Sequence, residues 1–236
     1  GFISKQKQSW KISFQEQKTE NNWDNSTLIG IDLPLFFKCP DPKAQTVMLV
    51  ALDPLRSRDD FSLELKGDSG VKLFNPGDPI IGTPFALHSS FYREDNDKKI
   101  RTKVYCDPIK HIVEKNYHLY VTDKYKVWMN DCEKEKESNK YKLKKEEVIF
   151  GELLLKELEI IKPNKIICFG VDPKDGAHVF CKGLLKDNDL KSELLPALLH
   201  PSGSNNNKWR SVLKTPPYDV PRKIRYLKTK IDEYLD

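Results

Sequence analysis

The sequence predicts an α/β protein of three layers (α/β/α), in which helices cover both faces of a central four-stranded parallel sheet. Four apolar runs bounded by turn-forming residues indicate buried strands, at 47–52, 117–122, 165–169 and 194–199. Helical stretches alternate with these runs, and such alternation is typical of a mostly parallel sheet with both faces covered. Because 236 residues suit one large domain better than two, we expect a single domain spanning residues 1–236.

The first part of the chain gives the weakest signal. Residues 1–45 show little periodicity, and we expect them to form a helical or irregular N-terminal extension that packs on the core. Strand 47–52 follows. The long connection 54–83 contains Phe61–Leu65, whose alternating pattern suits an extra edge strand or a hairpin.

Helices are predicted in the remaining intervals. Pro84 favours a helix start near residue 84 and an end near Arg93, because proline is well accepted in a first turn. A broad apolar stripe predicts a helix over Glu146–Ile161, which Pro163 ends. Strand 194–199 contains Pro196 and is therefore expected at an edge of the sheet. Further helices are expected at 108–115, 173–186, 207–214 and 220–235.

Cysteine usage and hydropathy indicate a cytoplasmic protein without a resident metal or cofactor. The five cysteines are scattered and form no C-x-x-C pair, which fits reduced thiols better than disulfides, zinc or an iron–sulfur cluster. No run of about 18 apolar residues predicts a membrane span. The first residues lack the apolar region of a signal peptide. Separately, we expect a monomer.

Positive charge is concentrated near the carboxyl end. Residues 200–230 hold eight lysines and arginines against the single Asp219, whereas the whole chain has a net charge of only +5. A concentrated basic surface favours a polyanionic partner, most simply nucleic acid. The alternative is a solvated helix face.

Two strand ends place polar residues where a ligand would bind. Asp53 follows strand 47–52, and His200 follows strand 194–199. Because groups just past the carboxyl ends of parallel strands line the ligand crevice, Asp53 and His200 are expected to face each other across one pocket. A carboxylate and an imidazole so placed can activate water and stabilise a leaving group. The alternative is that both residues merely cap turns.

Five segments in order carry a family resemblance. They are 52–55 (Leu-Asp-Pro-Leu), 82–85 (Gly-Thr-Pro-Phe), 121–123 (Val-Thr-Asp), 162–170 (Lys-Pro-Asn-Lys-Ile-Ile-Cys-Phe-Gly) and 200–202 (His-Pro-Ser). In this set the chain resembles the uracil-DNA glycosylase superfamily over roughly residues 47–214, without the cysteine motif of its iron–sulfur branch. The resemblance implies an enzyme that flips a damaged base out of DNA and hydrolyses its N-glycosidic bond.

The same resemblance implies roles for individual residues. Asp53 would orient water and stabilise the oxocarbenium-like sugar, and His200 would hydrogen-bond a carbonyl of the departing base. Phe85 would stack on the extruded base, unless it is an ordinary core residue, and Leu52 would help to line the base pocket. The expected DNA contacts are Ser202, Gly203, Lys208 and Arg210.

Asp123 departs from the family pattern. Relatives usually carry asparagine there, whose amide reads uracil directly, whereas an ionised carboxylate only accepts hydrogen bonds. Asp123 therefore puts uracil specificity in doubt and favours an exocyclic amine, unless its pKa is strongly raised. Asp123 could also be a simple turn residue at the end of its strand.

The loop after His200 is polar and lacks the apolar wedge that many relatives push into the vacated stack. Trp209 could serve as that wedge, although a core position is favoured. The polar loop suggests single-stranded DNA or mismatched duplex as the target.

The leading hypothesis is a DNA repair glycosylase acting on uracil or a related deaminated base. Two alternatives remain open: a catalytically lapsed protein of the same fold that binds DNA or another protein, and a hydrolase of free nucleosides or nucleotides.

Overall fold

A five-stranded, mostly parallel sheet forms the centre of the computed structural model. The structure describes residues 27–52, 80–86, 96–130, 147–171, 174, 176–201, 206–216 and 219–236. The strand order is β2 (Leu35–Phe37), β5 (His118–Asp123), β3 (Thr46–Ala51), β7 (Lys165–Cys168) and β8 (Glu193–Leu194). β5, β3, β7 and β8 are parallel, and β2 runs antiparallel to β5. The predicted α/β class is confirmed, but the predicted count of four strands is wrong.

The additional strand lies in the segment that was expected to be helical or irregular. β2 is only three residues long, so its sequence shows no measurable alternation. Its central residue, Phe36, is half exposed, as suits an edge strand. The last predicted strand, 194–199, is shorter than expected: β8 covers two residues, and a single bridge from Phe169 to Leu198 continues the pairing.

A second, three-stranded sheet was also not predicted. Its order is β4 (Ile80–Gly82), β1 (Thr27–Asp32) and β6 (Val127–Asn130). β1 pairs parallel with β4 and antiparallel with β6, so segments far apart in the sequence lie side by side. Because β6 begins four residues after the end of β5, this sheet is tied directly to the end of the central one.

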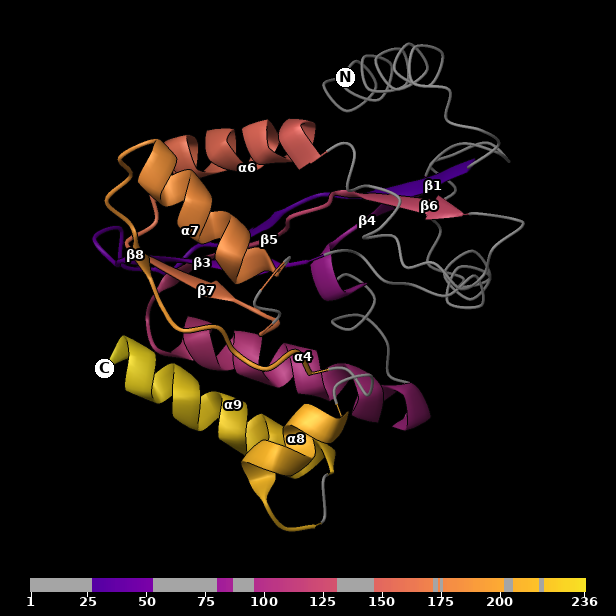
Figure 1. Ribbon diagram of the computed structural model, residues 1–236. Helices are drawn as coiled ribbons and strands as arrows, with labels where there is room; N and C mark the ends of the chain where they lie inside the picture. Colours follow the sequence, from indigo (N-terminus) through magenta and orange to yellow (C-terminus); the bar gives the residue numbers. More distant parts are fainter. Residues whose placement is uncertain are drawn as a thin grey trace.

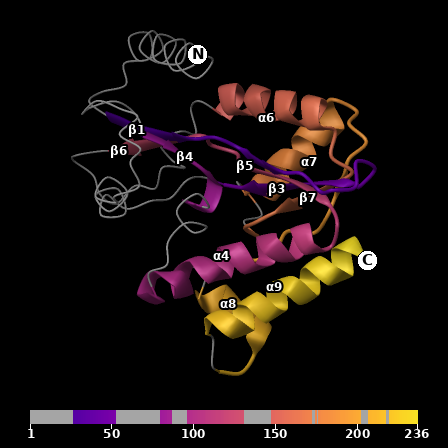
Figure 2. The same cartoon turned by 180° about the vertical axis from the view of Figure 1, so that it is seen from behind.

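Helices lie on both faces of the central sheet (Figures 1 and 2). On one face lie α6 (Glu147–Ile161) and α7 (Ala177–Asp187). On the other lie α4 (Asn96–Glu114), α8 (Asn206–Leu213) and α9 (Val220–Leu235). Alternate β3 residues face opposite ways, as the pleat of a strand requires: Val47 and Leu49 pack in the cluster with α4 and α9, and Met48 and Val50 in the cluster with α6 and α7.

The helix predictions succeed at the end of the chain and fail before Pro108. α6 and α9 begin within a residue of their predicted starts, and α8 lies where a helix was expected. α4 begins twelve residues earlier than predicted, with Pro108 in its interior. Burial of Val104, Ile109 and Ile112 offsets the backbone hydrogen bond that a proline cannot donate. Of the helix expected from residue 84, the described part is a 3-10 turn, η1 (Pro84–Ala86), and residues 87–95 lie outside the described residues.

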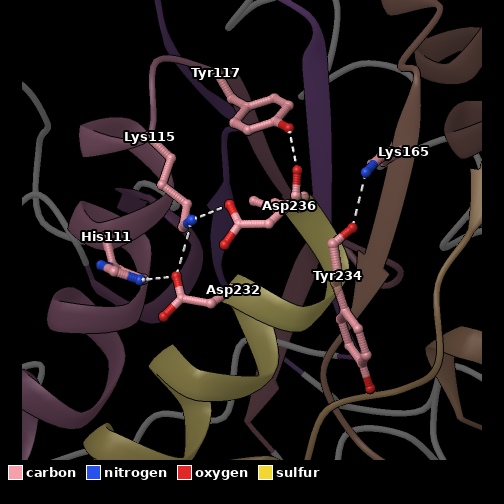
Figure 3. A network of polar contacts seen from close by, with 8 residues as sticks. His111, Lys115, Tyr117, Lys165, Asp232, Tyr234 and Asp236 are labelled. Atoms are coloured by element: carbon pink, nitrogen blue, oxygen red, sulfur yellow. Dashed lines mark hydrogen bonds and ion pairs between the residues drawn. The ribbon is translucent and has the colours of Figure 1, made fainter.

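Polar contacts hold the end of α9 against α4 and the amino edge of the sheet (Figure 3). Asp232 accepts hydrogen bonds from His111 at 2.7 Å and from Lys115 at 3.0 Å. These contacts hold the pKa of the Asp232 carboxyl below its usual value. The remaining contacts of this group join Lys115 to Asp236, the Tyr117 hydroxyl to Leu235 O, and Lys165 Nζ to Tyr234 O.

Cys39, Cys106, Cys168 and Cys181 are buried free thiols. Cys132 lies outside the described residues. In the part of the chain that the structure describes, no helix combines the length and apolar character needed to cross a membrane.

Candidate functional site

The carboxyl ends of the parallel strands bring three polar or aromatic residues to one edge of the sheet: Asp123, Phe169 and His200. Asp123 ends β5 and pairs in register with Ala51, the last residue of β3. Phe169 follows β7 directly, and its backbone N–H donates to Val50 O at 2.9 Å. His200 lies two residues beyond Leu198, the partner of Phe169. This is the edge at which a parallel sheet places its ligand crevice.

Asp123 is almost fully buried at this edge. Its side chain is 2% exposed, and strand alternation places it on the same face as Leu119 and Val121, which pack toward α4 and α9. Phe169 belongs to the same face. Since β3 separates their strands, Asp123 and Phe169 are two strand spacings apart, roughly 10 Å.

His200 is held by its backbone and surrounded by rings. Its carbonyl oxygen accepts a hydrogen bond of 3.1 Å from the indole N–H of Trp209, which is fully buried. Burial lowers the pKa of His200 from 6.5 to about 4, because the surroundings disfavour the charged imidazolium. His200 is therefore neutral near physiological pH and can donate a hydrogen bond from one ring nitrogen without carrying charge.

Four aromatic rings form one cluster on this face: Phe85, Tyr105, Phe169 and His200. Phe85 is stacked with Tyr105 at 5.2 Å between ring centroids and meets Phe169 edge to face at 5.6 Å. His200 is within 6.4 Å of Phe85 and Phe169 and within 5.8 Å of Tyr105. The members come from four separate segments, so the cluster forms only when the domain is folded.

The backbone of Phe85 is strained. Its φ of 57° and ψ of 19° lie in the left-handed region, which bulky residues rarely adopt. The ring contacts with Tyr105, Phe169 and His200 hold the residue in place. Strain of this kind occurs at functional sites, where the surrounding structure fixes a side chain in a required position.

The structure does not bring the side chain of Leu52 to this cluster. Leu52 packs with Tyr125, Val127 and Phe150, and its carbonyl accepts from the Tyr125 N–H at 3.0 Å. Asp53, the next residue, lies outside the described residues, as do Ser202 and Gly203.

Lys208 and Arg210 flank a buried tryptophan on α8. Both side chains are exposed, whereas Trp209 between them is fully buried and donates to His200 O. Trp209 is therefore a core residue, which was the favoured prediction, and it is not an exposed wedge. Because Trp209 anchors α8 and donates to His200 O, the helix that carries Lys208 and Arg210 is held close to His200.

Part of the basic segment serves the fold. Arg222 donates to Leu213 O at 3.2 Å and also to Thr215 O, which closes the turn between α8 and α9. Lys223 is buried over the Trp209 ring at 5.4 Å, and burial lowers its pKa. Lys230 pairs with Glu233. Fewer basic side chains of this segment are therefore exposed than the sequence suggests. The exposed ones include Lys208, Arg210, Lys214 and Arg225.

Sequence reasoning missed Tyr105. The helix that contains it was predicted to start at Pro108, so residue 105 was left without an element. Phe169 was recognised as part of a strand, but its contact with Phe85 depends on long-range packing. Tyr105 and Phe169 extend the predicted base-stacking position into a cluster.

A scan of the chain against models of protein families found no match, and a search of curated proteins found none either.

Proposed function

We propose that this protein is a DNA glycosylase of the uracil-DNA glycosylase type, with a three-layer α/β/α fold, that hydrolyses the N-glycosidic bond of a flipped base. The observation that carries the proposal is the ring contact of His200 with Phe85, at 6.4 Å between centroids, on the sheet face and at the carboxyl edge where Asp123 also lies. A ring to stack on, a neutral hydrogen-bond donor and a buried carboxylate are the groups that a flipped base requires.

His200 would assist departure of the base. As the glycosidic bond breaks, the sugar becomes an oxocarbenium-like cation and the base takes the bonding electrons. A neutral imidazole N–H that donates to a base carbonyl stabilises this developing negative charge in a site largely shielded from water. Since the pKa of His200 is about 4, it acts as a hydrogen-bond donor and not as a source of a proton.

Asp53 would act on the sugar. Its carboxylate is assigned to orient the attacking water and to stabilise the cation, on the strength of its position one residue after Leu52 at the end of the β3 segment. The water oxygen then bonds to the sugar carbon, and its proton leaves to the carboxylate or to solvent.

Asp123 would read the edge of the base. The Asp123 carboxylate, which is buried at this edge, would accept a hydrogen bond from an exocyclic amine of the base. Asp123→Asn is expected to shift the ratio of uracil release to cytosine release by about 1–3 kcal/mol toward uracil, the worth of one good base-edge contact. An unchanged ratio would mean that Asp123 does not face the base.

The exposed cations on α8 would contact the DNA backbone. Arg210→Ala and Lys208→Ala should each lower the slope of log affinity against log salt by about one unit, because each phosphate contact releases counterions. Lys186→Ala on α7 is the matched control, since Lys186 is exposed on the opposite face of the sheet. Equal slopes for all three variants would exclude α8 from the interface.

Single-stranded DNA or mismatched duplex is the proposed target, because the segment after His200 is polar. The proposed location is the cytoplasm, which the buried free thiols support, and the proposed state is a monomer.

One observation favours the alternative of a non-catalytic module. Phe85 is already stacked with Tyr105, so one face of the ring is filled by the protein itself. A binding module that has lost its chemistry could keep such a closed cluster.

An incision assay separates the two. Oligonucleotides that carry uracil, hypoxanthine, xanthine or unmodified bases are incubated with the protein and cleaved with alkali at abasic sites. Glycosylase activity predicts incision that Asp53→Asn and His200→Ala each slow by about 100-fold or more, with little change in DNA affinity. Incision that neither substitution slows would show that the reaction takes place at another site.

A further inference from the structure

The Tyr105 ring occupies space next to the position proposed for base stacking. Tyr105 lies on α4 and is stacked on Phe85 with 5.2 Å between centroids and 28° between planes. A base inserted between two rings needs them roughly 7 Å apart, twice a van der Waals contact of about 3.5 Å. In the observed arrangement, no base fits between Phe85 and Tyr105.

The other sides of Phe85 are also limited. Phe169 meets Phe85 edge to face, and His200 is tilted against it at 6.4 Å. A base that reaches Phe85 must therefore compete with these rings for space, and the Tyr105 ring covers a face of Phe85 on which a large base would stack.

Tyr105 is also suited to a role that depends on shape alone. Burial raises the pKa of Tyr105 to about 12, so its hydroxyl stays uncharged over the physiological range. Its side chain is half-buried, and its ring contacts Phe85 and His200, which belong to other segments than α4. Tyr105 thus bridges the stacking ring and the imidazole, and no charge on it would attract or repel a base.

We propose that Tyr105 determines which bases the site accepts, by setting the upper size limit of the base that can stack on Phe85. This inference rests on the proposed function and names a specificity residue within the same site. Tyr105 restricts access through the volume of its ring, and a smaller side chain at this position opens the site to larger, two-ring bases.

The test compares Tyr105→Leu, which removes the ring, with Tyr105→Phe, which keeps the ring and removes the hydroxyl. Single-stranded oligonucleotides carry either uracil, with one ring, or hypoxanthine, with two. Tyr105→Leu is expected to raise the release of hypoxanthine relative to uracil by about tenfold or more, the scale of a steric change in a pocket. Tyr105→Phe is expected to keep the ratio of the unchanged protein.

Tyr117→Leu is the matched control for loss of a tyrosine. The Tyr117 hydroxyl donates to Leu235 O at the opposite edge of the sheet, so this substitution weakens the fold without touching the cluster. Its ratio should not change. If Tyr105→Leu does not fold, Tyr105→Met replaces it, because a flexible methionine fills irregular core space.

A second measurement separates failure of this inference from failure of the proposed function. The fluorescence of 2-aminopurine in a single-stranded oligonucleotide is quenched when this two-ring base stacks on an aromatic side chain. If the unchanged protein releases no base at all, the proposed hydrolysis is wrong, and the size limit is judged by quenching alone. Titrations followed by this quenching give the affinity for the oligonucleotide. An affinity about tenfold higher for Tyr105→Leu than for Tyr117→Leu supports the inference. Equal quenching, or an equal release ratio, overturns it.

Discussion

Phe85 combines an unfavourable backbone with a full set of ring contacts. A non-glycine residue in the left-handed region costs roughly 1–2 kcal/mol, and at Phe85 this cost is offset by the stacked contact with Tyr105 and the edge-to-face contact with Phe169. The sequence gives no sign of this, because Thr83-Pro84 before it favours an ordinary helix start. The strain separates Phe85 from a phenylalanine that only fills a core.

Paired substitutions measure the strain. Phe85→Ala and Phe85→Gly both remove the ring, but only glycine adopts a φ of 57° without a steric penalty. The glycine variant should therefore be more stable than the alanine variant by about 1 kcal/mol. Urea unfolding of both variants measures the difference. An alanine variant that is as stable as the glycine variant, or more stable, would show that Phe85 is not held in this conformation in solution.

His200 should make stability depend on pH. Its pKa is about 4 in the folded protein and 6.5 in the ordinary, unfolded state, so the unfolded chain binds more protons between these values. The free energy of unfolding is therefore highest above pH 6.5 and falls as the pH is lowered toward 4, by up to about 3 kcal/mol.

Comparison with His200→Phe isolates this contribution, because the variant keeps a ring but cannot titrate. Urea unfolding at several pH values between 4 and 7 should show a weaker decrease for the variant than for the unchanged protein. Parallel curves would mean that His200 is exposed to solvent and titrates normally, and the neutral hydrogen-bond donor of the proposed mechanism would be lost.

The elements that position the site depend on a helix distant in the sequence. α9 packs its buried residues Leu227, Ile231 and Leu235 in the same cluster as Trp209 and Phe169. Trp209 in turn donates to His200 O. The last helix thus packs against the residues that support the site, and polar contacts at its end bind it to α4 (Figure 3).

Leu227→Ala tests this support. Leu227 is fully buried, so removal of its side chain should lower the free energy of unfolding by about 2–5 kcal/mol. Arg225→Ala on the exposed side of α9 should change it by less than about 0.5 kcal/mol. Thermal or urea unfolding gives both values, and equal losses would show that α9 is not packed as described.

Long, periodic elements were predictable from the sequence, and short elements were not. α6 and α9 carry apolar stripes over several turns, and β3, β5 and β7 are continuous apolar runs, so local pattern alone places them. β2, β4 and β8 have two or three residues each, and their pairing is decided by neighbouring strands. The start of α4 was predicted wrongly because proline locally favours a first turn. In the folded protein, tertiary packing outweighs this preference and Pro108 lies inside the helix.

The site was predictable only in part for the same reason. Asp123 and His200 follow strands that the sequence marks, so their place at one edge could be inferred from topology. The contact of Tyr105 with Phe85 and His200 joins a helix, a turn and a loop that no local pattern relates.

At the scale of the whole molecule, the site and the exposed cations lie on neighbouring parts of the chain. His200 closes the β8 segment, and Lys208 and Arg210 follow on α8. A polyanionic strand bound along α8 would lie next to the aromatic cluster. This arrangement suits a base presented from DNA better than a free nucleoside, which needs no such surface.

Cleavage of the bond between a base and its sugar is the activity that we propose, and direct measurement of both products tests it. The unchanged protein is incubated with a single-stranded oligonucleotide that carries one uracil, and with matched oligonucleotides that carry hypoxanthine, xanthine or only the four ordinary bases. Free base is measured by chromatography, and abasic sites are counted in the same sample. We expect equal amounts of free base and abasic site from at least one of these oligonucleotides, and a large decrease of both in His200→Ala. DNA binding without any free base would contradict it and identify the protein as a binding module.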